Sequence, residues 1–218
     1  MFFSLCISQD LNYQVRGKYN SPVTKETLNA SKTISDFRPG YPSSWIHEYI
    51  STEITVTGEG KFFKATGANE TLNAQQQILL SMAEVGEEIM VDVSYRYQNS
   101  ITGNNDVRLV HFVMTVIPET EAEFPGGYQQ LTTYLVKNAI HKISEKFPKE
   151  EQAVLIRFTV TESGKIANAQ ISDSSEDPEI DKLLLRAINT MPTWKPAENS
   201  EGIKIRQDFE FRVGNIGC

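Results

Sequence analysis

The carboxyl end of the chain carries the most regular pattern in the sequence, and this pattern limits the folds that the chain can adopt. From residue 203 to residue 213, apolar and charged side chains alternate, as they do in a half-buried β-strand. The apolar row consists of Ile203, Ile205, Phe209, Phe211 and Val213, and Gln207 interrupts it. Burying five such side chains contributes on the order of 10 kcal/mol before the entropy cost. We therefore expect the strand to pack its apolar face against helices.

The residues before this strand supply two helices and two further strands. The spacing becomes helical from Gly127, and residues 153–161 and 166–172 read as two strands joined by a turn at Gly164. Asp177 and Pro178 begin a second helix, because Asp accepts from free amides and Pro suits the first helical position. The sequence thus predicts an α+β domain at residues 124–214, with two helices and a three-stranded antiparallel sheet.

The first half of the chain predicts a separate β-rich domain at residues 52–119. Strands are expected at residues 53–57, 61–66, 89–97 and 107–117. One short helix lies between them, capped by Thr71 or Asn73. Residues 1–51 are interpreted as a lead-in segment that lies over this domain, and residues 119–123 as the linker to the next domain.

The first eight residues are apolar, and they are too short to span a bilayer, which needs about 20 residues. They resemble the end of a signal peptide, or they form a buried first strand. Cys6 and Cys218 are interpreted as two unpaired terminal thiols, and a disulfide between them stays open as the alternative.

No motif in the chain indicates catalysis, a metal or a cofactor. His47, His111 and His141 lack ligand spacing, and His111 is interpreted as a structural histidine within a strand. No nucleophile, base and orienting group occur in a known arrangement. The formal charge of −7 argues against a nucleic-acid partner. We expect a protein that is not an enzyme, uses no cofactor and has no membrane span in this chain.

A set of residues in the last third resembles the C-terminal domain of TonB, a periplasmic energy-coupling protein. The matching positions are Val154–Val160, Gly164, Ile166–Ile171, Ser174, Ser175, Ile180, Asp181, Ala187, Trp194, Pro196, Ala197, Gly202 and Phe209–Val213. The start, Phe124-Pro125-Gly126-Gly127, is similar to the variant in Bacteroidetes-type relatives. We assign structural roles to Trp194, which fills the core, to Pro196, which starts an irregular crossing, and to Gly164 and Gly202, which form turns.

The chain departs from the family where Phe147-Pro148 replaces Tyr-Pro and where residues 141–148 form a long insertion. No proline-rich spacer or anchor precedes the domain, so the resemblance implies the binding half of the family's activity. In the front domain, residues 72–76 and 86–89 resemble C-terminal modules of the gliding-motility protein GldM. That likeness implies an interaction domain of the cell envelope.

The resemblance to TonB implies a periplasmic protein-interaction protein of a Gram-negative cell envelope. An extended segment of a partner, such as an outer-membrane receptor, would add alongside the final strand, whose peptide groups would stay open. The residues expected to contact it are Lys204, Arg206, Asp208, Glu210 and Arg212. The alternative is that this face is solvated, or covered by the front domain or by a second copy in a homodimer.

A second hypothesis is an accessory or sensory module that binds a ligand of the cell envelope. An apolar pocket lined by Tyr41 and Trp45 would favour it.

Overall fold

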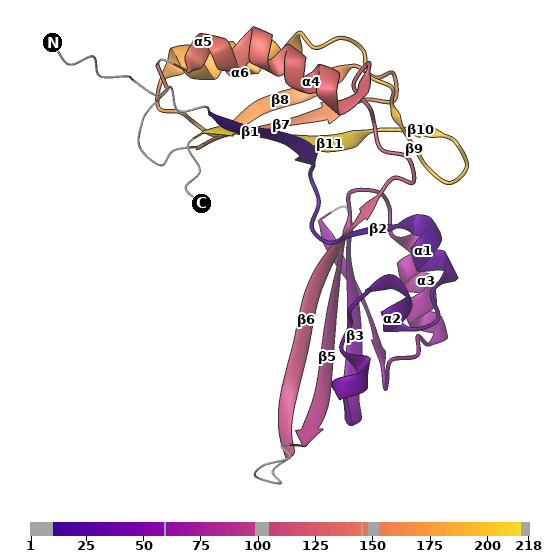
Figure 1. Ribbon diagram of the computed structural model, residues 1–218. Coiled ribbons are helices and arrows are strands. Elements are labelled where there is room, and N and C mark those ends of the chain that lie inside the picture. Colours follow the sequence, from indigo (N-terminus) through magenta and orange to yellow (C-terminus); the bar gives the residue numbers. More distant parts are fainter. Residues whose placement is uncertain (1–10, 59, 99–104, 145, 148–152, 215–218) are drawn as a thin grey trace, which may run out of the picture. The chain divides into compact units, whose positions relative to one another are not determined.

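The computed structural model describes residues 11–58, 60–98, 105–144, 146–147 and 153–214, and these form two compact units (Figure 1). One unit is Tyr19–Glu119, and the other joins the residues up to Lys18 with those from Thr120 onward. The lead-in segment expected over residues 1–51 is therefore divided between the two units. The expected signal-peptide remnant at residues 1–8, Cys6 and Cys218 lie outside the described residues.

The C-terminal unit is built on an antiparallel sheet in the order β1-β11-β7-β8. Its strands are β1 (Asn12–Gly17), β11 (Gln207–Gly214), β7 (Ala153–Val160) and β8 (Ile166–Asp173). The three predicted strands are present, and β1 adds a fourth that was not predicted from the sequence. A two-stranded sheet of β9 (Ala197–Glu198) and β10 (Lys204–Ile205) precedes β11. The single strand expected over residues 203–213 is thus two strands, which part at Arg206.

Helices cover one face of this sheet (Figure 1). They are α4 (Gly127–Leu135), the π-helical turn η2 (Val136–Ile140), α5 (His141–Ile143) and α6 (Pro178–Asn189). The helix α6 begins as predicted, because Asp177 caps it and accepts from the amide of Glu179 at 2.9 Å. Between helices and sheet lies an apolar core in which Ile156, Leu184 and Phe211 are fully buried.

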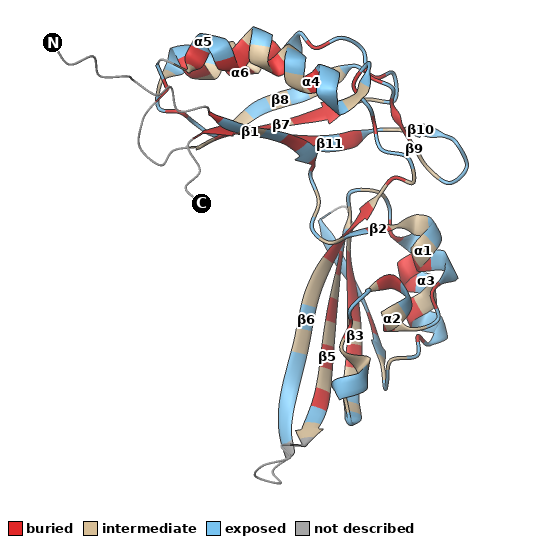
Figure 2. Cartoon of the chain, in the orientation of Figure 1, coloured by how far each residue is buried: buried red, intermediate tan, exposed pale blue. Residues whose placement is uncertain are grey.

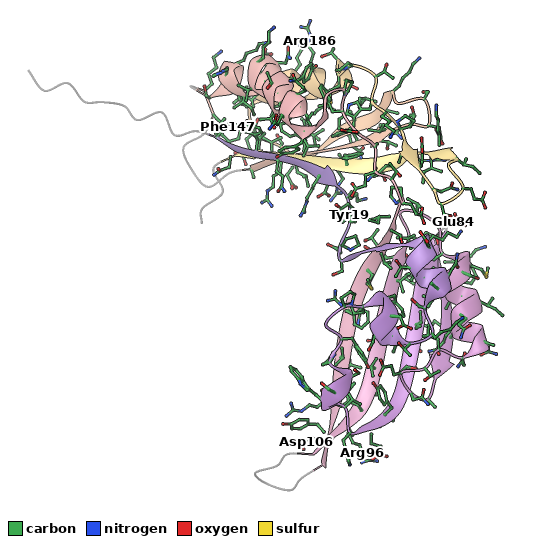
Figure 3. The ribbon with its side chains drawn as sticks, turned by 45° about the vertical axis from the view of Figure 1, so that its right-hand side comes forward. Tyr19, Glu84, Arg96, Asp106, Phe147 and Arg186 are labelled. Atoms are coloured by element: carbon green, nitrogen blue, oxygen red, sulfur yellow. The ribbon has the colours of Figure 1, made fainter. Side chains whose placement is uncertain are left out.

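The other unit has a five-stranded sheet in the order β2-β6-β5-β3-β4. The strands are β2 (Pro22–Thr24), β6 (Asn105–Ile117), β5 (Glu88–Gln98), β3 (Glu48–Gly58) and β4 (Lys61–Gly67). The strand β2 runs parallel to β6, and the other pairs are antiparallel. Arg96 and Asp106 mark the outer end of the long hairpin formed by β5 and β6 (Figure 3).

Helices pack on this sheet in larger number than expected. They are α1 (Lys25–Ala30), α2 (Ile34–Phe37), α3 (Ala74–Met82) and the 3-10 turn η1 (Ser43–Trp45). The expected short helix is α3, and its cap is Asn73, whose side chain accepts from the amide of Gln76 at 3.0 Å. Figure 2 shows the buried residues concentrated in β3, β5 and the sides of the helices that face the sheet. In the first half of β6, residues 106–109 are exposed. Both units are therefore α+β in character, each with its own core.

Candidate protein-interaction surface

The face of the C-terminal sheet opposite the helices carries a row of charged side chains. The strand register places Arg16, Glu210 and Arg157 side by side on β1, β11 and β7. Glu210 lies between the two arginines, with Oε1 3.2 Å from Nε of Arg157 and Oε2 3.5 Å from Nη2 of Arg16. The Glu210 side chain is only 14% exposed, so the two arginines shield its charge from solvent. The Glu210 carboxylate on β11 thus forms ion pairs with residues on both neighbouring strands.

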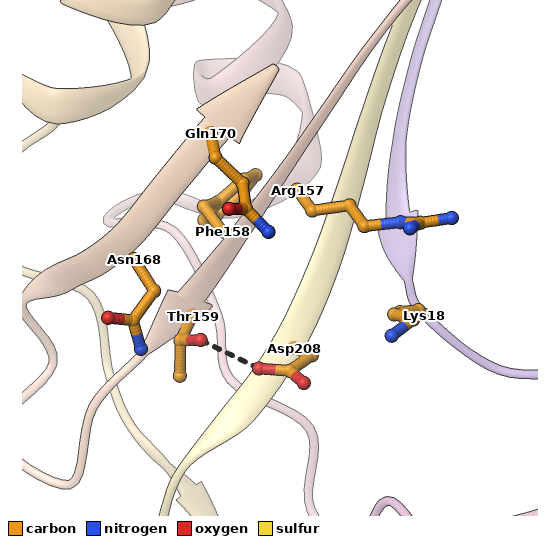
Figure 4. A pocket seen from close by; sticks show the side chains of 7 residues that line it. All are labelled: Lys18, Arg157, Phe158, Thr159, Asn168, Gln170 and Asp208. Atoms are coloured by element: carbon orange, nitrogen blue, oxygen red, sulfur yellow. Dashed lines mark hydrogen bonds between the residues drawn. The ribbon is translucent and has the colours of Figure 1, made fainter. Parts of the chain in front are cut away.

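Next to this row the surface is hollowed over a volume of about 210 Å³ (Figure 4). The hollow is lined by Lys18, Arg157, Phe158, Thr159, Asn168, Gln170 and Asp208. The hydroxyl of Thr159 donates to Oδ1 of Asp208 at 2.7 Å. Apart from Phe158, the lining side chains are polar or charged, whereas pockets for small organic ligands are larger and mostly apolar. The hollow therefore suits polar side chains of another protein better than an apolar ligand.

The pairing of β7 with β8 is irregular beside this hollow. The pairing register shifts between Arg157 and Thr159, and Asn168 on β8 has a φ of 53°. Asn adopts this left-handed region more readily than most residues. Bulges bend a strand and disrupt its ladder, so β8 is an irregular edge of the sheet.

The final strand is not an edge of the sheet, which corrects the expectation that its peptide groups stay open. β11 pairs with β1 on one side and with β7 on the other, so its backbone groups face strands in both directions. The amide of Lys18 also donates to the carbonyl of Asp208 at 2.9 Å. The strand that covers this edge belongs to the same chain, and it comes from the segment interpreted as a lead-in.

The five residues expected to contact a partner are only partly brought together. Asp208, Glu210 and Arg212 lie on β11 with their side chains on the uncovered face. Lys204 lies in β10, and Arg206, between the strands, has its Nε 3.9 Å from Oε1 of Glu162. Three residues of this face, Arg16, Lys18 and Arg157, were not predicted from the sequence, although alternation along each strand would have placed them there.

Of the four residues assigned structural roles, Trp194 and Gly164 are in contact at the β7–β8 turn. Trp194 is buried, with its ring 5.2 Å from that of Phe209 and 5.6 Å from that of Phe124. Its amide donates to the carbonyl of Gly164 at 2.8 Å. Pro196 is buried, and Gly202 lies in the turn before β10 with a φ of 73°.

Gln207, which interrupts the apolar row, attaches the linker after Glu119 to the sheet. Its Oε1 accepts from the amide of Ala122 at 2.7 Å, and its Nε2 donates to Glu121 at 2.9 Å. The side chain is buried, and an unpaired amide there would lose its hydration without compensation. The polar residue in the apolar row is therefore explained by the segment it binds.

The serine pair before α6 is ordered around one carboxylate. Asp181 accepts from the hydroxyls of Ser174 and Ser175, at 2.6 Å and 2.7 Å, and from the amide of Ser175 at 2.9 Å. Burial raises the pKa of Asp181, but these three hydrogen bonds favour the charged form and together lower the pKa below its usual value. The carboxylate thus fixes the start of the helix to the end of β8.

The remaining candidates for chemistry lie apart. Nδ1 of His111 lies 2.8 Å from Oδ1 of Asp92 on the neighbouring strand. Among the described residues, no group of three His, Cys, Asp or Glu residues could hold a metal ion. Tyr41 is buried against Phe112, whereas Trp45 is 74% exposed, so these two residues do not share an enclosed pocket.

The geometry defines the C-terminal unit as an α+β module in which helices cover one face of a four-stranded sheet and polar residues line the other. Residues 148–213 match the family described as Gram-negative bacterial TonB protein C-terminal, which confirms the resemblance found in the sequence. The match includes β7, β8, α6 and β11. The likeness of the front domain to GldM is not confirmed.

No curated protein and no solved structure matches the chain. In the part of the chain that the structure describes, every helix is too short or too polar to cross a bilayer.

Proposed function

We propose that this protein is a non-enzymatic, periplasmic protein-interaction protein of the Gram-negative cell envelope. Its C-terminal unit binds an extended segment of another protein, such as an outer-membrane receptor or a component of an envelope complex. The match of residues 148–213 to the TonB C-terminal family supports this class of function. The uncovered polar face of the sheet supports a protein as the partner, since it offers charged groups and backbone rather than an enclosed cavity.

The mode of binding is strand exchange, in which the partner's segment takes the place of β1 beside β11. The observation that supports this mode is the position of β1 in the sequence. This strand completes the C-terminal sheet, although the whole of Tyr19–Glu119 separates it in sequence from the other strands. An extended segment remote in sequence is therefore already added to β11. A partner with the same alternation could occupy the same register.

The contacts of β1 indicate what such a partner would look like. On the side facing the helices, Leu11 and Val15 are buried in the core. On the uncovered side, Arg16 approaches Glu210. The partner segment would therefore carry apolar residues at alternate positions and a basic residue opposite Glu210. We assign Asp208, Glu210 and Arg212 to contacts with its outward side chains, and Lys204 and Arg206 to contacts with the chain that continues beyond the sheet.

The binding mode can be tested by NMR titration of the full chain with synthetic peptides from the segments that precede receptor plugs. We expect the amides of residues 208–214 to shift, together with those of residues 12–17, because β1 leaves as the peptide binds. Shifts at β8 alone would contradict exchange at β11. Titration up to millimolar peptide without any shift in these segments would contradict the proposed function.

A further inference from the structure

The strand β4 forms an exposed, apolar edge of the other unit's sheet. Among the described residues, β4 pairs only with β3, so the backbone groups on its outer side meet no strand. The strand begins Lys61-Phe62-Phe63-Lys64, and Phe62 and Phe63 are 67% and 46% exposed. Edge strands of this kind are templates for pairing with another chain, and proteins usually blunt them with charges, proline or bulges. The strand carries two charges, Lys61 and Lys64, but the β3–β4 pairing runs without a bulge or proline, and the two phenylalanines between the lysines are exposed.

Further apolar side chains are exposed on the helix beside this edge. The helix α3 packs against β4, and its Ile78 and Met82 are each 60% exposed. They are four residues apart and so lie on the same side of the helix. Single exposed apolar residues are common, but a group on one strand and its neighbouring helix indicates an interaction surface.

The two phenylalanines lie on opposite faces of the sheet. Phe63 is opposite Val56, which is buried, so Phe63 lies on the face that the helices cover. Phe62 is opposite Thr57 and lies on the other face. A partner that covers both rings must therefore continue the sheet, because a helix or loop placed on one face would leave the other ring exposed.

We propose that this partner is a second copy of the chain, whose own β4 pairs antiparallel to the first about a two-fold axis at Phe63. In this register each Phe63 lies opposite the Phe63 of the other copy, and each Phe62 lies opposite Lys64. The first pair is aromatic with aromatic, and the second places the aliphatic stem of Lys64, whose ammonium group is ion-paired with Glu53 at 2.7 Å, beside a ring. Both pairs stabilise a sheet when they lie directly opposite each other. The sequence of β4 is thus complementary to itself.

Neighbouring registers fit less well. A two-fold axis at Lys64 would place the two Lys64 side chains directly opposite each other, and like charges in that position are destabilising, although the ion pair of each with Glu53 offsets part of the repulsion. That register would also include Thr66, whose carbonyl already accepts from Nδ2 of Asn73. A two-fold axis between two residues would put opposed side chains on different faces, which the period of a sheet does not allow. An axis at Phe62 would shorten the paired segment at its start, beside the turn after Gly58.

A two-fold axis at Ala65 would pair Phe63–Gly67, a segment of the same length as Lys61–Ala65, but that segment includes Thr66, whose carbonyl already accepts from Nδ2 of Asn73 at 2.9 Å. The register at Phe63 pairs Lys61–Ala65 without a like-charge contact and without Thr66.

Sedimentation equilibrium of the full chain over increasing concentration tests the proposal. We expect a monomer–dimer equilibrium for the unchanged protein. Phe63→Asp and Phe63→Lys should each weaken it more than tenfold, because residue 63 faces its own copy and each variant opposes like charges. A mixture of the two variants should restore dimers, since Asp then faces Lys. Leu109→Asp is the control, because Leu109 is 61% exposed on β6, away from β4.

A second pair of variants keeps the test decisive if changes at Phe63 disturb folding, which far-UV circular dichroism would reveal. Phe62→Glu should keep or strengthen the dimer, because the carboxylate faces Lys64 of the other copy, and Phe62→Lys should weaken it. A protein that stays monomeric at its highest soluble concentration overturns the proposal. So does a dimer that is unaffected by these changes, or one that responds equally to Glu and Lys at position 62.

Discussion

Gly164 joins the turn between β7 and β8 to the tryptophan that fills the core of the C-terminal unit. Its φ is 76°, a conformation that L side chains rarely adopt, and an added Cβ would lie 2.0 Å from the carbonyl oxygen of Trp194. That oxygen belongs to the backbone and cannot move aside without shifting the buried ring. Glycine is therefore required at this position for two reasons: it adopts this conformation without strain, and it has no side chain to clash with the carbonyl oxygen.

We predict that Gly164→Ala lowers the free energy of unfolding by about 3 kcal/mol, combining the cost of the left-handed conformation with that of overpacking. The matched control is Gly202→Ala, because Gly202 has nearly the same φ, 73°, and a Cβ added there would meet no atom within 4 Å. The control should lose only about 1 kcal/mol. Chemical denaturation measures both values, and equal losses would show that the contact with Trp194 does not matter.

Asp181 makes the stability of the same unit depend on pH. Its pKa is lowered in the folded state, despite the opposing effect of burial, because Ser174 and Ser175 donate to the carboxylate. A lowered pKa stabilises the fold above the unfolded value of 3.8, and this contribution is lost as the pH falls through the lowered pKa.

We predict that Asp181→Asn reduces stability at pH 7 and flattens the fall of stability at acid pH. Urea denaturation at a series of pH values between neutral and about 2 measures both effects. Curves of the variant and the unchanged protein that run parallel through the acid range would contradict the lowered pKa.

At the scale of elements, strands and helices with strong local signals could be predicted, and β1 could not. Asp177 and Pro178 predicted the start of α6 because a cap and a first-position proline act through adjacent residues. In contrast, β1 has a short sequence, Asn-Tyr-Gln-Val-Arg-Gly, in which only Val15 is a buried aliphatic residue. Its partner β11 lies almost at the other end of the chain, and no local pattern encodes that pairing.

The position of the final strand within the sheet was predicted wrongly for the same reason. The alternation of Phe209, Phe211 and Val213 predicted which face is buried, and the structure has these residues in the core. Alternation says nothing about which strands lie on either side. The charged row on the uncovered face was therefore only half predicted, because Arg16 and Arg157 come from neighbouring strands.

At the scale of the whole molecule, the chain leaves the C-terminal unit at Lys18 and returns to it at Thr120. The segment that completes the sheet is thus tied to it through Tyr19–Glu119 as well as through pairing with β11. Because the tether keeps β1 close to its site, it acts at a high effective concentration, and a partner in solution must compete with it. Substitutions that weaken the pairing of β1 with β11 should therefore raise the affinity for the partner.

The ladder between β1 and β11 shows which change weakens β1 without touching the core. The hydrogen bond from the Lys18 amide to the Asp208 carbonyl makes these two residues a bonded pair, and such pairs recur at every second residue of an antiparallel ladder. Gln14, opposite Arg212, is therefore in a bonded pair, and its side chain is exposed. Gln14→Pro removes that amide, whereas Gln14→Ala keeps it.

The affinity of the full chain for a fluorescent peptide that copies residues 11–18 decides between exchange and simple addition. If the partner replaces β1, Gln14→Pro should bind the peptide about tenfold more tightly than the unchanged protein, since the loss of one ladder hydrogen bond weakens the competing strand by about 1 kcal/mol or more. Gln14→Ala should bind as the unchanged protein does. Fluorescence anisotropy that shows equal or weaker binding by Gln14→Pro would contradict strand exchange at β11.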